Sequence, residues 1–138
     1  MRTLKSFIYE AVKAAQGINA FVILKPEFLK YQEQFEDMLK NNDWQIIQHK
    51  KFKMPLKTAQ ELYKMHEKKD FYKDLCEYMS SDDCICYTLS KDIADPIKDM
   101  DKLKDKVRKT WGKDDMKNAM HSSDSEENVK RESNIIFN

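Results

Sequence analysis

The sequence predicts an α+β domain in which four strands form an antiparallel sheet and helices pack against it. Two short apolar runs, Ala20–Leu24 and Cys84–Leu89, have the length and the β-branched and aromatic content of buried strands. Between and after these runs, apolar residues recur at helical spacing, and clusters of turn residues separate the segments. The chain of 138 residues suffices for one ordinary domain and is short for two.

The first half of this domain reads as strand, helix and strand. The strand over 20–24 ends at Lys25-Pro26. From Glu27 to the turn residues at 41–43, apolar residues fall near helical spacing, which predicts an amphipathic helix. Residues 44–53 mix apolar and polar side chains in a partly alternating pattern. This pattern is typical of an antiparallel strand with one face toward water.

The second half is predicted to begin with a helical hairpin, formed by residues 58–66 and 71–79. The near-continuous apolarity of 84–89 places that strand in the centre of the sheet. The Lys- and Asp-rich segment 92–105 is predicted to form a short polar helix or a surface loop.

The last part of the chain is predicted to contain a loop, a short helix and a strand. The loop runs from Trp111 to His121, Ser123 or Asp124 caps the helix, and 134–137 forms the strand. The resulting order, β-α-β-(α-α)-β-α-β, matches the split βαβ unit of a ferredoxin-like α/β sandwich, with helices over one face of the sheet.

The first residues form a separate unit in this interpretation. Residues 1–15 are basic and carry apolar side chains at helical spacing, so we expect an amphipathic helical extension over 1–17 and the domain over 18–138. The extension would pack on the domain or on a protein partner. A mitochondrial presequence is the alternative, because such peptides are basic, amphipathic and poor in acidic residues.

The composition excludes several classes of protein. With 25 basic and 24 acidic residues the net charge is +1, so no global field favours nucleic acid or an anionic membrane, and we expect no nucleic-acid partner. No apolar run approaches the ~20 residues of a transmembrane helix. The three cysteines, Cys76, Cys84 and Cys86, are interpreted as reduced core thiols.

Three polar residues could meet at one end of the sheet: Lys25 after the first strand, Arg108 in a loop, and His121. Two cations and a neutral imidazole suit a phosphoryl group, which needs donors for its oxygens and a nucleophile in line. Taken singly, a lysine after a strand is usually solvated and a lone loop histidine is usually structural.

Three helix residues admit two interpretations. By helical period alone, Tyr63, Phe71 and Leu75 are core residues. If the hairpin lies at the rim of a cleft, an exposed aromatic among them could stack on a nucleobase.

Several segments resemble the motifs of the nucleoside diphosphate kinase family. Residues 118–125, N-A-M-H-S-S-D-S, resemble N-x-x-H-G-S-D-S, and residues 22–27, V-I-L-K-P-E, resemble I-K-P-D. Leu62-Tyr63 and residues 70–72 are similar to the family's H-Y and R-P-F-F elements. Val107-Arg108 is similar to the I-R of T-I-R-G-D, with identical spacing onward to the histidine.

The resemblance implies a role for each matching residue. His121 would be the nucleophile that carries the phosphoryl group, and Glu132, at the matching position beyond the helix, would accept a hydrogen bond from its other ring nitrogen. Ser123 would shape the loop and the contact to Glu132. The remaining matches would bind nucleoside di- and triphosphates: Lys25, Tyr63, Arg108 and Asn118 would hold the phosphates and the sugar, and Phe71 and Leu75 the base. Mg²⁺ would bridge the phosphates, with no direct protein ligand to the metal.

The sequence departs from the family pattern at several places, which include the context around Arg108 and the C-terminal tail of the family, expected to be absent here; two further departures lie near the predicted site. Ser122 stands where the family has glycine, and the segment before Arg108 is shorter, without a recognisable second phosphate-binding arginine. Lys98, Lys102 or Lys104 could substitute for that arginine, as point charges in place of a planar fork.

Two hypotheses follow for the function. The first is a nucleoside diphosphate kinase. The second is a catalytically weak or inactive domain of the same fold, serving as a structural subunit of a larger mitochondrial or ciliary assembly through the N-terminal helix. An intracellular location is expected in both, with cytoplasm, mitochondrion and cilium left open. A ferredoxin-like RNA-binding module is disfavoured, because the predicted sheet lacks paired exposed aromatics.

Overall fold

The computed structural model describes residues 17–138. The extension predicted over 1–17 therefore lies, apart from Gly17, outside the described residues. The described part is ordered as follows: β1 (Ala20–Leu24), the 3-10 helix η1 (Leu29–Tyr31), α2 (Gln32–Asn41), β2 (Gln45–Lys53), α3 (Leu56–Leu62), the 3-10 helix η2 (Lys64–His66), α4 (Tyr72–Met79), β3 (Asp83–Ser90), α5 (Pro96–Trp111), β4 (Met120–Ser122) and α6 (Glu126–Phe137).

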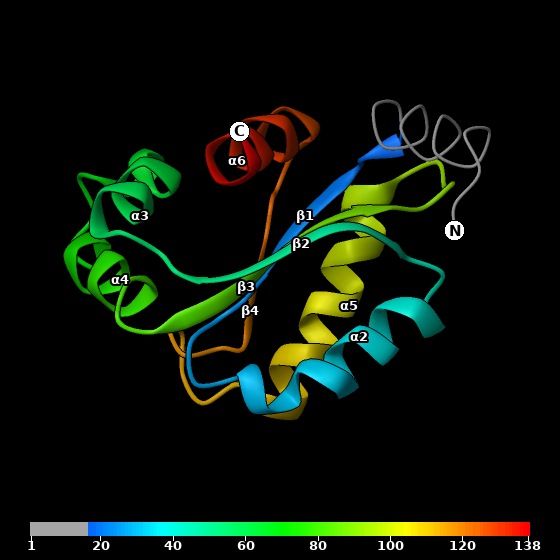
Figure 1. Cartoon of the computed structure of the whole chain (residues 1–138), viewed down its shortest axis with the longest axis horizontal. Helices are drawn as coiled ribbons and strands as arrows, with labels where there is room; N and C mark the ends of the chain where they lie inside the picture. The colour runs from blue at the N-terminus through cyan, green and yellow to red at the C-terminus, as the bar shows by residue number, and fades with distance from the viewer. Residues whose placement is uncertain (1–16) are drawn as a thin grey trace, which may run out of the picture.

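The four strands form one antiparallel sheet in the order β2-β3-β1-β4 (Figure 1). All five residues of β1 are buried, as the apolar run predicts. β3 lies between β2 and β1, so the predicted central position of this strand is confirmed. The short strand β4 pairs with the other side of β1 and sets Ile23 opposite His121. The ferredoxin-like sandwich is thus confirmed.

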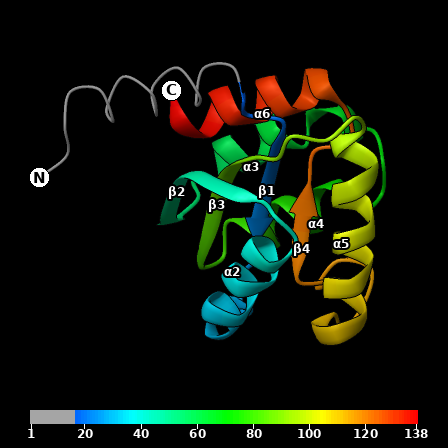
Figure 2. The ribbon, with the colours of Figure 1, turned by 90° about the vertical axis from the view of Figure 1, so that its right-hand side faces the viewer.

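Helices cover both faces of the sheet, so the expectation of helices over one face is wrong. Side chains of β1 alternate between two hydrophobic clusters: Val22 and Leu24 pack with α2 and α5, whereas Phe21 and Ile23 pack with α3, α4 and α6. Figure 1 shows α2 and α5 together, away from α3 and α4, and Figure 2 shows α6 and α2 at opposite ends of the view with the sheet between them.

The C-terminal residues 134–137 are the last turn of α6, so the predicted terminal strand is wrong. The fourth strand is β4 instead, only three residues long. The Ile-Ile-Phe run suggested a strand, but Val129, Glu132 and Ile136 are the buried residues of one continuous helix. These residues form one buried stripe that packs against the sheet, and this packing outweighs the local propensity of the segment to form a strand.

The Lys- and Asp-rich segment is also helical over a longer range than predicted. α5 spans 16 residues and ends at Trp111, so Arg108 lies in a helix and its placement in a loop is wrong. Asp95 caps this helix by accepting from the Lys98 backbone N–H at 3.1 Å, and Pro96 takes the first helical position. The buried residues Met100, Leu103 and Val107 form its apolar stripe.

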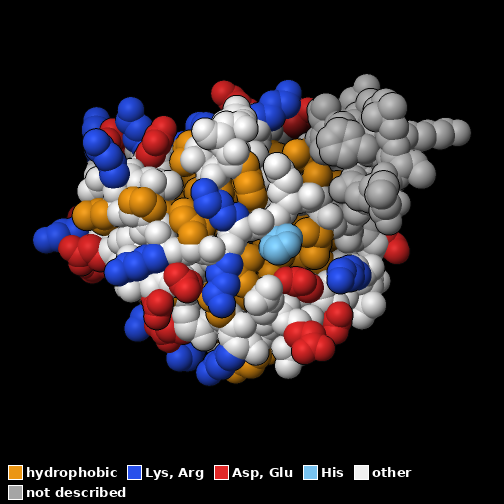
Figure 3. Space-filling model, in the orientation of Figure 1, with side chains coloured by type: hydrophobic (Ala, Val, Ile, Leu, Met, Phe, Trp, Pro, Cys, Tyr) orange, Lys and Arg blue, Asp and Glu red, His pale blue; other side chains and the backbone are white. Residues whose placement is uncertain are grey.

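The distribution of surface charge and the state of the cysteines agree with what the composition predicts. Figure 3 shows basic and acidic side chains interspersed over one face of the molecule, with no field of a single sign. Cys76, Cys84 and Cys86 are free and buried, which confirms them as reduced core thiols. Within residues 17–138, no helix is long and apolar enough to cross a bilayer.

Candidate active site

His121 is held in place by the sheet below it and by two aromatic rings. It lies in β4, opposite Ile23 of β1, on the face that α3, α4 and α6 cover. The Tyr63 ring stands edge-on to the imidazole at 5.4 Å between centroids, and the Phe21 ring does so at 6.3 Å. The predicted loop histidine is therefore a strand residue with a defined ring orientation.

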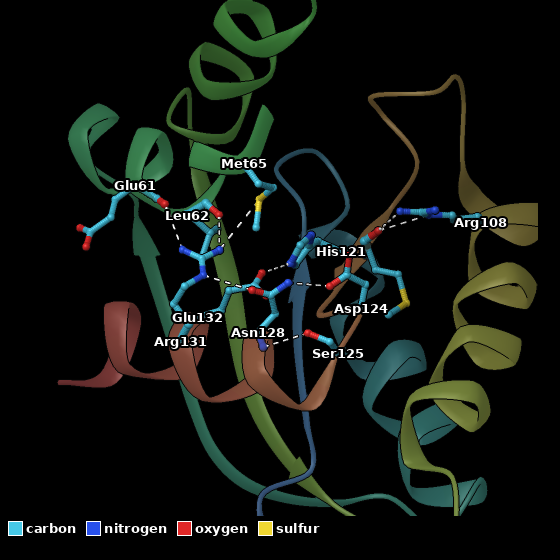
Figure 4. A network of polar contacts seen from close by, with 11 residues as sticks. Glu61, Leu62, Met65, Arg108, His121, Asp124, Ser125, Asn128, Arg131 and Glu132 are labelled. Atoms are coloured by element: carbon cyan, nitrogen blue, oxygen red, sulfur yellow. Dashed lines mark hydrogen bonds and ion pairs between the residues drawn. The ribbon is translucent and has the colours of Figure 1, made fainter. Parts of the chain in front are cut away.

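Glu132 approaches His121 from α6, within the helix and not beyond it as the motif match implied. Its Oε1 lies 2.5 Å from the His121 Nε2, and the carboxylate side chain is only 2% exposed (Figure 4). An ionised carboxylate can only accept, so Nε2 carries the proton of the neutral ring. The lone pair then lies on Nδ1, so this nitrogen is the one that can act as a nucleophile.

The helix start explains why Glu132 reaches His121. The N-cap of α6 is Ser125, and not Ser123 or Asp124 as predicted: its Oγ accepts from the Asn128 backbone N–H at 3.1 Å. Glu132 follows this cap by about two helical turns, which returns its side chain to the cap side of the helix, toward β4.

Lys25 is almost completely buried at the end of β1, with 4% of its surface exposed. Its Nζ donates to Asn118 Oδ1 at 2.8 Å and to the Met116 carbonyl at 3.1 Å. Burial, followed by the charges of Arg108 and Lys104, lowers the pKa of Lys25 to about 7, although Asp114 opposes the shift. A bound anion would stabilise the protonated form of this group.

Asn118 is presented by a strained turn. The next residue, Ala119, has φ +79°, a left-handed conformation that costs an L-residue ~1–2 kcal/mol. Lys25 N–H donates to the Ala119 carbonyl at 2.9 Å, which ties the turn to β1. Backbone strain of this kind concentrates at functional sites, because the surrounding structure must hold it.

Arg108 reaches β4 from the opposite face of the sheet. Its Nε and Nη2 donate to the Met120 carbonyl at 3.3 and 3.0 Å. Burial holds the pKa of Arg108 below its usual range. Lys104 lies one turn earlier on α5 and is the lysine, among the three possible substitutes for the missing arginine, whose charge acts on Lys25. Lys98 and Lys102 are exposed.

The predicted base-binding residues lie on the hairpin of α3 and α4. Phe71, at the N-terminus of α4, is 44% exposed, and its ring lies 5.5 Å from that of His66. Leu75 is 8% exposed and packs in the core, so the structure places it beneath the hairpin surface. Tyr63 is 4% exposed, and its hydroxyl has no hydrogen-bond partner among the described residues.

The two serines after His121 are both buried. Ser123 Oγ has no hydrogen-bond partner within residues 17–138, so the contact to Glu132 that the resemblance implied is not formed. Ser122 is paired with Val22, whose side chain faces α2 and α5. Strand alternation therefore directs Ser122 away from the face of His121, and its side chain does not crowd the imidazole.

Comparison with known proteins identifies the family. Residues 19–138 match the family model described as nucleoside diphosphate kinase. The chain belongs to the nucleoside diphosphate kinase family. The nucleoside diphosphate kinase of Chlorobium limicola is 30% identical over 131 residues, an alignment that covers 86% of this chain and 92% of that protein. That of Prosthecochloris aestuarii is 29% identical over 132 residues, with the same coverage.

Solved structures agree with this assignment. The nucleoside diphosphate kinase of Aquifex aeolicus superposes with a TM-score of 0.73 at 27% identity, covering 86% of this chain and 94% of that one. The enzyme from Encephalitozoon cuniculi gives a TM-score of 0.75 at 17% identity, over 86% and 87% of the two chains, and shows the shared fold. Family membership favours a nucleoside diphosphate kinase-like function over a structural subunit.

The motif comparison missed two polar residues that lie next to the His121–Glu132 pair on α6. Arg131 connects α6 to the end of α3 by donating to two backbone carbonyls there, and Asn128 accepts a hydrogen bond from the same guanidinium (Figure 4). A sequence signal was present: Asp124, Asn128 and Arg131 recur at i, i+4 and i+7, the spacing of polar neighbours on one helix face.

Proposed function

We propose that the protein transfers the γ-phosphoryl group of a nucleoside triphosphate to a nucleoside diphosphate through His121. The observation that carries the proposal is the His121–Glu132 pair, in which a buried carboxylate oxygen lies 2.5 Å from Nε2, accepts a hydrogen bond from it and leaves Nδ1 free. Nδ1 attacks the γ-phosphorus, the bond from phosphorus to the bridging oxygen breaks, and the diphosphate leaves with that electron pair. The acceptor diphosphate then reverses the step.

The cations near β1 support the binding of a polyphosphate. Arg108 and Lys104 lie close enough to Lys25 for the charge of each to lower the pKa of Lys25, in addition to the larger effect of burial. Converging cations of this kind are stabilised by the oxygens of a phosphate group. A bound phosphate would replace the Met116 carbonyl as an acceptor for Lys25, while Asn118 remains available for the sugar and the Tyr63 hydroxyl for a phosphate oxygen.

The nucleoside would lie over the hairpin. Phe71 supplies an exposed aromatic face, on which any nucleobase can stack. Leu75, beneath it, supports that surface from the core.

Mg²⁺ would accompany the nucleotide. Within residues 17–138 no group of three or more His, Cys, Asp or Glu could hold a metal ion. Magnesium is commonly held by substrate phosphates and water, where it neutralises charge on the transferred group.

The test is labelling with γ-labelled ATP in the presence of Mg²⁺. We expect acid-labile, base-stable label on the wild-type protein and none on His121→Ala, because the phosphoryl group resides on the imidazole. His49→Ala is the matched control, since His49 is exposed on β2 and should leave labelling unchanged. An unlabelled wild-type protein would refute the proposal.

A further inference from the structure

Arg131 connects the helix that carries Glu132 to the hairpin that carries Tyr63 and Phe71. Its Nη1 donates to the Glu61 carbonyl at 3.2 Å and its Nη2 to the Leu62 carbonyl at 3.0 Å. These carbonyls belong to the last turn of α3, where backbone acceptors lack partners inside the helix and carry partial negative charge. The guanidinium thus binds the hairpin immediately before Tyr63.

The other side of the guanidinium is fixed by a second contact. Arg131 Nε donates to Asn128 Oδ1 at 3.2 Å, and Asn128 Nδ2 donates to Asp124 Oδ1 at 2.6 Å. Asp124 follows His121 by three residues. Figure 4 shows the resulting series of contacts, from the turn after His121 across the first turns of α6 to the end of α3.

Apolar packing and the arginine have separable roles at this interface. Val129 and Ile136 of α6 are buried in the same cluster as Ala59 and Leu62 of α3, so the two helices remain in contact without Arg131. Apolar contacts are non-directional, whereas a guanidinium with three hydrogen bonds to oxygen and one to the Met65 sulfur has a defined orientation. Arg131 therefore determines the placement of the end of α3 more than it determines folding.

We infer that Arg131 is a positioning residue that holds Tyr63 and Phe71 in register with the His121–Glu132 pair. The inference rests on the proposed function, because the position of the hairpin relative to the His121–Glu132 pair matters for a substrate that contacts both. A nucleotide contacts the hairpin through its base and His121 through its γ-phosphate. A small phosphoryl donor without base or sugar makes no contact with Phe71, and its only contact with the hairpin is the Tyr63 hydroxyl beside His121.

The experiment compares two donors on three full-length proteins: wild type, Arg131→Met and, as the matched control, Lys130→Met, whose side chain is exposed on the same helix. The rate of His121 phosphorylation is measured with Mg-ATP and with phosphoramidate. For Arg131→Met we expect kcat/KM with ATP to fall about 10- to 100-fold, mainly through KM, and the rate with phosphoramidate to stay within about twofold. Arg131→Lys should recover part of the loss.

Two results would overturn the role of Arg131 without touching the proposed function. One is an unchanged rate with ATP in Arg131→Met. The other is an equal loss with both donors, which would mean general damage to the fold.

Amide hydrogen exchange supplies a readout that needs no activity. Arg131→Met should accelerate exchange at residues 62–71 and leave β1 protected, while Lys130→Met should change neither. Unchanged exchange over 62–71 would refute the role of Arg131, even if the protein proves inactive. An unlabelled wild type with the expected exchange pattern would instead contradict the proposed function, and with it only the catalytic consequence of the Arg131 contacts.

Discussion

Lys25 is a candidate site residue whose charge depends strongly on its surroundings. Its ammonium group is removed from water, faces two other cations and hydrogen-bonds one carbonyl and one amide oxygen. Such a group is charged below a pH of about 7 and largely neutral above it. An anionic phosphate stabilises only the charged form, so binding of the anion and binding of the proton are linked.

This linkage predicts a pH dependence of nucleotide binding. A phosphate next to Lys25 raises its pKa, so the free protein must take up a proton to bind at a pH above about 7. The affinity for ADP should therefore fall as the pH rises, by up to about tenfold per pH unit. Calorimetric titrations between about pH 6 and about pH 9 in buffers of different ionisation enthalpy would measure both the affinity and the proton uptake.

Lys25→Met should remove the proton uptake, and the exposed Lys98→Met should retain it. Equal proton uptake in wild type and Lys25→Met would show that another group titrates.

Glu132 yields a second prediction at this scale. Glu132→Gln keeps the size of the side chain but removes the negative charge that fixes the tautomer of His121 and stabilises the imidazole as it bonds to phosphorus. Single-turnover phosphorylation by ATP should slow by roughly 10- to 1,000-fold, as for other carboxylate–histidine pairs. The exposed Glu127→Gln, on the same helix, should react at the wild-type rate. A fast Glu132→Gln would show that the tautomer is set by another group.

At the scale of elements, the sequence predicts those strands and helices whose local pattern and tertiary environment agree. β1 and β3 are buried on both faces, so their apolar runs identify them. α5 was harder to predict, because its buried residues Met100, Leu103 and Val107 are separated by charged ones. The end of α6 has the β-branched residues that favour a strand, and only packing against the neighbouring sheet selects the helix.

The turn between α5 and β4 has no room for a side chain at Gly112. A Cβ atom added to Gly112 would lie 2.5 Å from the Arg108 carbonyl oxygen and 3.3 Å from the Asn118 Cα, both backbone atoms. Gly112→Ala should therefore reduce the free energy of unfolding by about 1–3 kcal/mol, measured by urea denaturation. Asp115→Ala, an exposed change in the same turn, should cost less than about 0.5 kcal/mol. Equal midpoints for the two variants would contradict the close packing of this turn.

At the scale of the whole molecule, the site is a product of topology. β4 joins β1 at the edge of the sheet, and this pairing brings Asn118 and His121 next to residues almost a hundred positions earlier in the chain. No local pattern contains that information. The predicted order of elements allows Lys25, Arg108 and His121 to meet, and only the resemblance adds Asn118 and Glu132. Motifs do not identify residues whose partners are backbone groups. Arg131 of α6, which donates to two carbonyls at the end of α3, is an example.

The central claim is that His121 carries a phosphoryl group between two nucleotides, and isolation of the phosphorylated protein tests it most directly. The full-length protein is labelled with γ-labelled ATP, separated from nucleotide, and then mixed with an unlabelled diphosphate of a different base. We predict that the label leaves the protein and appears in the matching triphosphate, with none released as inorganic phosphate at a comparable rate. Label that stays on the protein, or that is lost only to water, would contradict the claim.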